Sequence, residues 1–226
     1  MKREQGFTLI EIAIVLVIIG LLLGGVLKGQ ELITSARVRN LITTQDGVKA
    51  AYFGFLDRYR GLPGDYSGAT TNIPNCGGCQ NGNNDGQILL NGAILESISA
   101  WEHLSKAGFV TGSYVYAATA AATNTPVNPY GSLVQLIYDV QYQDGATYPA
   151  ASLRHNLKTG NNIPSDIMAE VDRKVDDGQA TGGQIRFTTY GGVTNTPPAT
   201  GSCFVIATGT WNSATSIANC GATTLF

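Results

Sequence analysis

The sequence predicts an α+β protein in which one long N-terminal helix packs on an antiparallel β-sheet. Three observations lead to this fold class. An apolar run extends from Phe7 to Leu27, an amphipathic pattern continues it to Arg60, and later segments are rich in the β-branched and aromatic residues that strands favour. The chain has 226 residues, which is enough for a membrane segment and one domain with a hydrophobic core.

The apolar run predicts a single transmembrane helix. A helix from Phe7 to Leu27 can cross about 30 Å of hydrocarbon at about 1.5 Å per residue. The polar segment before it contains Lys2 and Arg3, which favour the cytoplasmic side of a membrane. A secretory signal peptide would be cut at small residues after its apolar part. The stretch 27–31 contains no such site, so we expect the apolar segment to remain in the mature protein.

Glu11 is the only charged residue between Phe7 and Leu27. A carboxylate inside hydrocarbon costs at least about 2.5 kcal/mol even on lenient insertion scales. One interpretation is an ordinary membrane anchor whose Glu11 lies close enough to the interface to stay hydrated. That interpretation leaves the residues just before Glu11 unexplained.

The series Gly6-Phe7-Thr8-Leu9-Ile10-Glu11 resembles the processing motif of type IV prepilins and type II secretion pseudopilins. Four features coincide, namely a basic leader, a Gly before the cut, a Phe after it and a Glu within the membrane segment. The resemblance implies that a prepilin peptidase cuts between Gly6 and Phe7 and N-methylates Phe7. It also implies that Glu11 pairs with the amine of Phe7 on an adjacent subunit during assembly, which neutralises both charges.

The helix is expected to continue beyond the membrane. An apolar stripe recurs at helical spacing and predicts a face packed on a globular domain: Leu41, Val48, Tyr52, Phe55 and Tyr59. The stretch 60–64 contains two Gly residues and a Pro, which predict the helix end. A helix with a lipid half and an amphipathic half is the architecture that pilins share. Many major type IV pilins carry a Pro in this helix, and its approximate place is held here by Lys28, which favours a pseudopilin or a minor pilin.

These observations predict four segments. Residues 1–6 form a leader peptide, residues 7–27 a transmembrane helix segment, residues 28–60 its amphipathic continuation, and residues 61–226 an exported, pilin-like globular domain. The resemblance implies a single-pass protein of the bacterial inner membrane with a periplasmic C-terminal domain, and a place at the cell surface or in a pilus after assembly. In residues 61–226 acids outnumber bases and no basic run occurs, which argues against nucleic acid as a partner.

Within residues 61–226 we expect two helices and three strands. One helix has Ile94 to Leu104 on one face, with Asn91 as its N-cap and Gly108 at its end. A second runs from about Pro164 to Lys174. The predicted strands are Leu133–Tyr142, Gln184–Tyr190 and Cys203–Thr208, and Ala117–Asn128 is expected to be a loop.

The four cysteines of an exported protein indicate disulfides, and three connectivities are possible. The pairing Cys203–Cys220 is favoured because it ties down the end of the chain, as in many pilins, and it leaves Cys76 and Cys79 as a local loop. A redox dithiol and half of a zinc site are the alternatives. A zinc site needs four ligands, and neither a second close Cys pair nor a His cluster occurs in the sequence.

One segment has the pattern of a partial calcium loop. Asn81, Asn83 and Asp85 place side-chain oxygens at alternate positions before Gly86. Gly92 stands where such a loop has its bidentate Glu, so the alternative is a polar turn. A second acidic group, Asp172, Asp176 and Asp177, follows the second predicted helix. Calcium is therefore a possible cofactor, and no other is indicated.

No catalytic constellation appears in the sequence, so we do not expect an enzyme. His103 and His155 are far apart in sequence, and His103 is interpreted as a packed or surface residue. The expected partners are a prepilin peptidase, other pilin or pseudopilin subunits and the inner membrane. Two functions remain open, namely a structural filament subunit and a minor, tip-located pilin that acts as an adhesin or substrate-recognition module.

Overall fold

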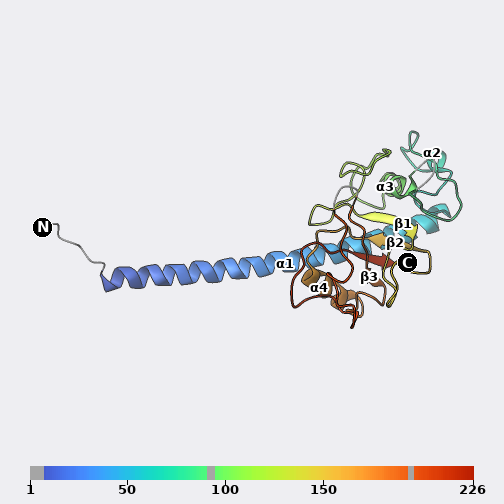
Figure 1. Cartoon of the computed structure of the whole chain (residues 1–226). Helices are drawn as coiled ribbons and strands as arrows, with labels where there is room; N and C mark the ends of the chain where they lie inside the picture. Colours follow the sequence, from blue (N-terminus) through green and yellow to red (C-terminus); the bar gives the residue numbers. More distant parts are fainter. Residues whose placement is uncertain (1–7, 91–94, 193–195) are drawn as a thin grey trace. The chain divides into compact units, whose positions relative to one another are not determined.

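The computed structural model describes residues 8–90, 95–192 and 196–226 (Figure 1). In chain order the elements are α1 (Leu9–Tyr59), α2 (Ala69–Asn72), α3 (Glu96–Lys106), β1 (Gln135–Asp139), β2 (Arg154–Lys158), α4 (Ser165–Val175), β3 (Ile185–Phe187) and β4 (Ala222–Leu225). The chain forms two compact units, residues 1–38 and residues 39–226.

The described part of the first unit is the N-terminal portion of α1. Its side chains from Leu9 to Leu27 are exposed all round the helix, and the large apolar ones are between 46% and 89% exposed. This stretch is long and apolar enough to cross a membrane. A helix that is apolar on every side is stable only where lipid or protein surrounds it.

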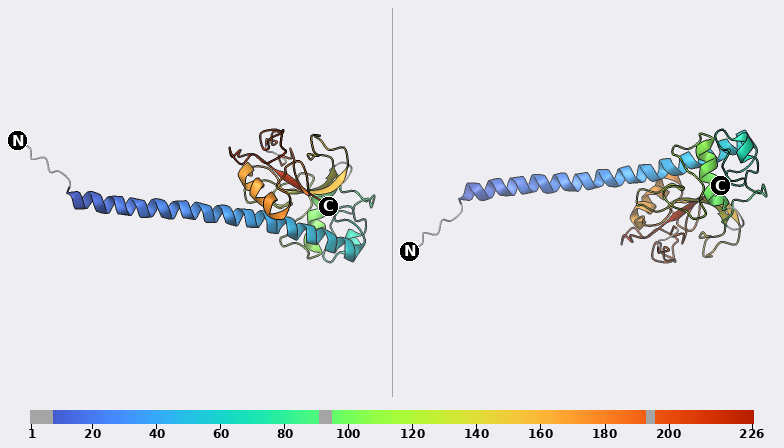
Figure 2. Two further views of the ribbon diagram at one scale, coloured as in Figure 1. Left: turned by 90° about the horizontal axis from the view of Figure 1, so that it is seen from below. Right: turned by 90° about the horizontal axis from the view of Figure 1, so that it is seen from above.

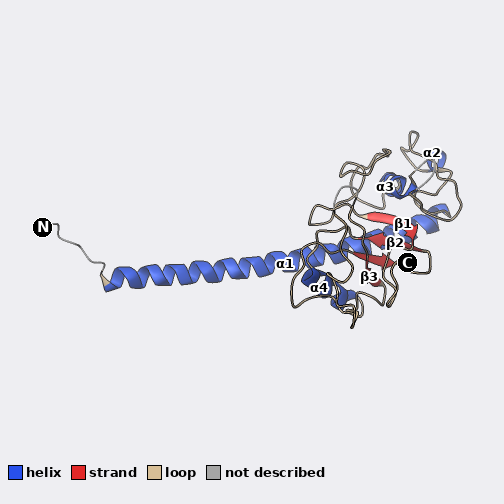
Figure 3. Cartoon of the chain, viewed as in Figure 1, coloured by secondary structure: helices blue, strands red, loops and turns tan. Residues whose placement is uncertain are grey.

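The second unit contains a four-stranded antiparallel sheet in the order β1-β2-β4-β3, drawn in red in Figure 3. β1 and β2 pair with Leu136 opposite Leu157, and β2 pairs with β4 with Leu157 opposite Thr224. The C-terminal strand β4 therefore lies inside the sheet, between two elements that come earlier in the chain. α3 contacts β1.

The C-terminal portion of α1 provides one wall of the core of this unit. Its predicted stripe is buried at Leu41, Val48, Tyr52 and Phe55, and Tyr59 is half-buried. Phe55 packs in a cluster with Trp101 of α3 and with Leu136 and Leu157 of the sheet. Because this helix segment contributes so much apolar surface, the globular unit begins within α1, at Arg39, and not after the helix ends.

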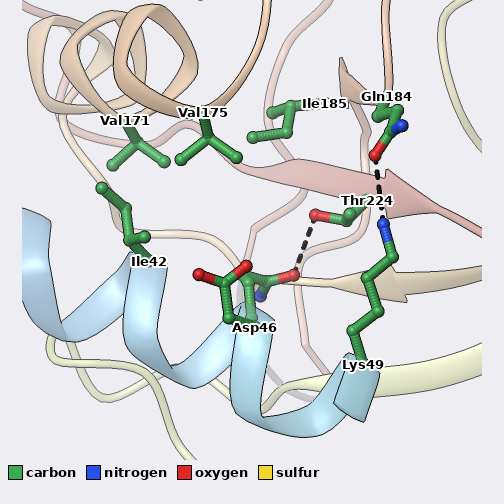
Figure 4. A pocket seen from close by; sticks show the side chains of 9 residues that line it. Ile42, Asp46, Lys49, Val171, Val175, Gln184, Ile185 and Thr224 are labelled. Atoms are coloured by element: carbon green, nitrogen blue, oxygen red, sulfur yellow. Dashed lines mark hydrogen bonds between the residues drawn. The ribbon is translucent and has the colours of Figure 1, made fainter. Parts of the chain in front are cut away.

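Polar contacts fix the same helix segment against the sheet. Thr224 Oγ1 of β4 donates to Gln45 Oε1 at 2.9 Å, and Lys49 Nζ donates to Gln184 Oε1 at 3.1 Å. Figure 4 shows these contacts beside Val171 and Val175 of α4, and Figure 2 shows α4 from two further sides. The long helix, α4 and the sheet thus meet around a small, mostly apolar pocket.

The helix ends where the sequence predicts. Arg60 has φ 55°, and the next turns lead to Gly64, whose φ is 89°. A Cβ on Gly64 would lie 2.3 Å from the backbone oxygen of Glu96. Both the left-handed conformation and the close approach to α3 therefore require glycine at this position.

Other predicted elements agree with the structure in part. α4 matches the second predicted helix closely. α3 begins at Glu96 with Leu95 as its N-cap, so the prediction of Asn91 as the N-cap is wrong; Asn91 and Ile94 themselves lie outside the described residues. β1 and β3 lie inside the predicted strands, but both are shorter. The loop at 117–128 contains no helix or strand.

The predicted strand Cys203–Thr208 is wrong. Phe204 forms only an isolated bridge with Trp211, and the chain then turns, since the N–H groups of Thr208 and Gly209 both donate to the carbonyl of Val205. Strands β2 and β4 were not predicted. Their sequences, RHNLK and ATTL, lack a run of apolar residues. The buried polar side chains of Asn156 and Thr223 bond to each other, and Lys158 pairs with Asp139 of β1.

Replacing Gly64 by Ala should lower the free energy of unfolding by at least about 2 kcal/mol, because the left-handed strain and the backbone clash add. Gly77→Ala is the matched control, since Gly77 has open space around its Cα and should change stability by less than about 0.5 kcal/mol. Urea unfolding of the full chain in detergent measures the free energy of unfolding of both variants. Equal stability of the two variants would contradict the assigned packing.

Candidate functional site

Glu11 closes a capping box at the start of α1. Its Oε2 accepts hydrogen bonds from the backbone N–H of Thr8 at 2.7 Å and from Thr8 Oγ1 at 2.8 Å. In return, the N–H of Glu11 donates to Thr8 Oγ1 at 3.3 Å. This is the reciprocal arrangement of the S/T-x-x-E motif, which satisfies two of the otherwise unpaired N–H groups of a helix start.

The capping box gives Glu11 a partner within its own chain. The carboxylate lies at the positive end of the helix dipole, where a negative charge is stabilised. The sequence identified Glu11 as an unusual charge but did not assign it this role. The three-residue spacing from Thr8 to Glu11 does predict a capping box. Gly6 and Phe7, the predicted cleavage pair, lie outside the described residues.

All four cysteines form disulfides. Cys203 pairs with Cys220 across a sequence separation of 17 and a Cα–Cα distance of 5.6 Å, and Cys76 pairs with Cys79 at 5.0 Å. This is the connectivity favoured from the sequence. The four sulfur-bearing side chains are buried, and no cysteine is free. With every sulfur paired, none is present as the thiolate that a zinc site or a reduced dithiol requires.

The polar side chains of the predicted calcium loop form hydrogen bonds within the protein. Asn81 bonds to Thr70, since its Oδ1 accepts the N–H of Thr70 at 3.0 Å and its Nδ2 donates to Thr70 Oγ1. Asn83 Oδ1 accepts the N–H of Asp85, and Asp85 Oδ1 accepts the N–H of Gln87. Calcium binding through Asn81, Asn83 and Asp85 stays a prediction.

Two buried acids that were not predicted as site residues lie beside this loop. Carboxylate oxygens of Asp65, Asp85 and Glu96 lie within 4.8 Å of one another. Asp65 accepts the N–H groups of Asp85 and Gly86 at 3.0 Å and 2.9 Å, and Glu96 accepts that of Leu89 at 3.0 Å. Burial raises the pKa of both Asp65 and Glu96, and the backbone donors partly oppose that rise. These carboxylates organise the loop.

α3 holds the surrounding loops through side chains on its buried face. Glu102 accepts the N–H of Tyr116 at 3.2 Å, and Ser99 Oγ donates to the carbonyl of Gly64 at 3.3 Å. His103 is fully buried and bridges two loops, because its Nδ1 accepts the N–H of Gly64 at 2.9 Å while Nε2 lies 2.7 Å from the carbonyl of Gln80. The His therefore has a structural role, with the proton on Nε2. Burial lowers the pKa of His103 to about 4.

A second acidic group forms where α4 ends. Carboxylate oxygens of Asp172, Asp176 and Asp177 lie within 4.8 Å of one another. Asp172 is completely buried, and its Oδ2 accepts the indole N–H of Trp211 at 2.6 Å. Burial raises the pKa of Asp172 to about 6, an effect only partly opposed by Trp211. The sequence placed these three acids together, but it gave no sign that one of them is buried.

Lys158 of β2 is a buried cation. It forms an ion pair with Asp139 of β1, and its Nζ also donates to Gln141 Oε1 at 2.7 Å. The ring of Tyr190 lies 5.4 Å from Nζ, within the range of a cation–π contact. These partners compensate the charge, and the pair ties the two strands together from the interior.

The neutral, buried His103 predicts acid sensitivity. Its folded pKa of about 4 lies below the ordinary value near 6.5, so its contribution to stability is complete above pH 6.5 and is lost as pH falls toward 4. The loss amounts to about 3 kcal/mol.

His103→Gln keeps a donor and an acceptor at the position but cannot titrate. Its free energy of unfolding should therefore fall less than that of the native chain between pH 7 and pH 4.5. The buried carboxylates act in the opposite direction in both proteins and cancel in the comparison. The same decline in the two proteins would show that His103 is not the group responsible.

Comparison with known proteins adds one finding. A family model described as the prokaryotic N-terminal methylation motif matches residues 1–27. No significant match was found among curated proteins or among solved structures. The matched region contains Gly6, Phe7, Thr8 and Glu11 and extends to the end of the apolar run. The chain therefore carries the prepilin-type N-terminal signature, joined to a pilin-like α+β architecture.

Proposed function

We propose that the protein is a prepilin that becomes a structural subunit of a type IV pilus-like or type II secretion filament. The observation that carries the proposal is the prepilin-type motif at residues 1–27, with Glu11 as the one charge in its apolar segment. A charge in this position is costly in lipid and is retained only with a partner or a function.

Processing and location follow from the motif. A prepilin peptidase cuts between Gly6 and Phe7, which removes the leader, residues 1–6. The peptidase then methylates the new N-terminal amine of Phe7. Residues 7–27 hold the precursor in the inner membrane, with residues 61–226 on the periplasmic side. The positive charges of Lys2 and Arg3 support this orientation, since basic residues stay on the cytoplasmic side.

Assembly replaces lipid around α1 by other subunits. Among the described residues of α1, every side chain between Leu9 and Leu27 is exposed. In the precursor this surface is solvated by lipid, and in a filament the helices of neighbouring subunits would take its place. Glu11 of one subunit then pairs with the new amine of Phe7 on another, which removes the cost of both charges. The role is structural, with homologous or identical subunits as partners.

A minor, tip-located pilin that recognises a surface or a substrate is the second candidate. The long loops of the second unit favour it, because they make residues 61–226 large for a repeating coat subunit. Copy number separates the two functions. A main subunit dominates the protein in sheared filaments, whereas a tip subunit is present at a few copies in each filament.

Gly6→Val should leave a full-length precursor in the membrane, because the peptidase requires a small residue before the cut. Mass spectrometry of the N-terminus should find Met1 in this variant and methylated Phe7 in the native protein. Gly20→Val is the matched control, since it makes the same change within the apolar segment and away from the cut. A methylated Phe7 in the Gly6→Val variant would refute the processing site.

A further inference from the structure

We propose that a groove beside α1 in the second unit binds a short, neutral oligosaccharide. The groove has a volume of about 550 Å³ and is lined by residues 40–48 of α1, by Trp101 of α3 and by the loops at 109–114 and 126–127. Its volume lies within the range of ordinary small-molecule sites. Two observations carry the proposal, namely the side chains that line the groove and a glycine of α1 that packing within the described chain does not require.

The groove is uncharged. None of the twelve described residues that line it is acidic or basic, although acids outnumber bases in residues 61–226. A charged ligand would lose its hydration in the groove without gaining an ion pair, which is costly. The lining therefore disfavours phosphates, nucleotides and acidic sugars, and it favours a neutral ligand.

Three of the lining side chains are aromatic, namely Trp101, Phe109 and Tyr114. The N–H of Phe109 donates to the carbonyl of Leu104 at 2.9 Å, so the start of this loop is tied to α3. The ring of Phe109 also lies against α1, since a Cβ on Gly54 would be 2.8 Å from it. The face of an aromatic ring carries partial negative charge. It attracts the C–H groups on the face of a sugar ring.

Hydrogen-bonding side chains accompany these aromatic rings. α1 contributes Asn40, Thr43 and Thr44, and the loop adds Thr111. Thr44 Oγ1 donates to Asn40 Oδ1 at the long distance of 3.5 Å. Within the part of the chain that the structure describes, the hydroxyls of Thr43, Thr111 and Tyr114 make no hydrogen bond. Hydroxyl groups both donate and accept, as do the hydroxyls of a sugar.

Gly47 is the second observation that points to a ligand. It lies in the interior of α1, where glycine is less favourable than every residue except proline, and it lines the groove. No described atom outside the helix backbone lies within 4 Å of the Cβ position at Gly47. Gly54 differs, because the ring of Phe109 occupies that place. A glycine at an open position allows a molecule from outside to approach the helix backbone closely.

The elements around the groove favour a sugar over a peptide. An extended peptide binds by pairing with the edge of a strand, and none of the described lining residues belongs to a strand. An amphipathic helix binds through its apolar face in a hydrophobic groove, whereas hydroxyl and amide groups are present here among the rings. An oligosaccharide offers both apolar C–H faces and hydroxyl groups. This ligand class would suit the recognition function that is the second candidate above.

The test uses the full chain in a detergent without a sugar headgroup, so that the detergent cannot compete for the groove. The probes are cellobiose, lactose, maltose and N,N′-diacetylchitobiose, with digalacturonate as the acidic comparison. Calorimetry should find a Kd at or below about 1 mM for at least one neutral disaccharide. Digalacturonate should bind more weakly than that disaccharide.

Two variants place the binding in the groove. Gly47→Leu adds a side chain where the structure has open space, so it should abolish binding and leave the Tm at or above the native value. Tyr114→Ala removes one ring and should weaken binding at least about fivefold. Gly29→Leu and Phe53→Ala are the matched controls, since they make similar changes on α1 at residues that do not line the groove. Both controls should bind as the native chain does.

The proposal is overturned if none of the neutral disaccharides binds, or if the affinity is unchanged in Gly47→Leu or in Tyr114→Ala. Tighter binding of digalacturonate would also overturn it. Loss of filaments in Gly47→Leu without any sugar binding by the native chain would assign the groove to a neighbouring subunit instead. Sugar binding is measured on the isolated chain, so its outcome is separate from that of the filament function.

Discussion

One helix with two different surfaces is the constraint on which the rest of this protein depends. From Leu9 to Leu27, α1 is apolar on every side, and its side chains are exposed within the part of the chain that the structure describes. From Arg39 onward the same helix is amphipathic, and Val48, Tyr52 and Phe55 enter the core beside α3 and the sheet. The first surface demands lipid or other subunits, and the second is the foundation of the globular unit. A fragment that begins after Tyr59 would therefore lose a wall of its core.

The globular unit is rich in loops. Polar side chains satisfy many of the backbone N–H and C=O groups that strand pairing would satisfy in a regular sheet. α3 presents Glu96, Ser99, Glu102 and His103 to the loops around it, and each satisfies a backbone group. Buried donors and acceptors are costly when unpaired, so this satisfaction is what permits long irregular segments to pack. The two disulfides add covalent closure at both ends of the loop region.

The sequence predicted those features that depend on strong periodicity. The long helix, α3, α4 and the central parts of β1 and β3 follow from apolar spacing and from Gly and Pro at the ends. β2 and β4 could not be predicted in this way, because Asn156, Lys158 and Thr223 are buried polar residues whose partners come from distant segments. The roles of Asp65 and Glu96 could not be predicted for the same reason, because the backbone N–H groups that they accept belong to a loop. Thr8 was different, since the capping-box spacing to Glu11 is visible in the sequence alone.

The central claim is that assembly requires the charge of Glu11 and not its contribution to the helix cap. Two substitutions separate these roles. Glu11→Gln removes the charge but can still cap, because Gln also serves at this position of a capping box. Thr8→Ala removes the side-chain half of the box and keeps the charge. The measurement is the yield of sheared filaments, divided by the amount of processed subunit in the membrane. This yield should fall sharply for Glu11→Gln and stay near the native value for Thr8→Ala. Filaments at native yield from Glu11→Gln, with no native copy present, would contradict the account.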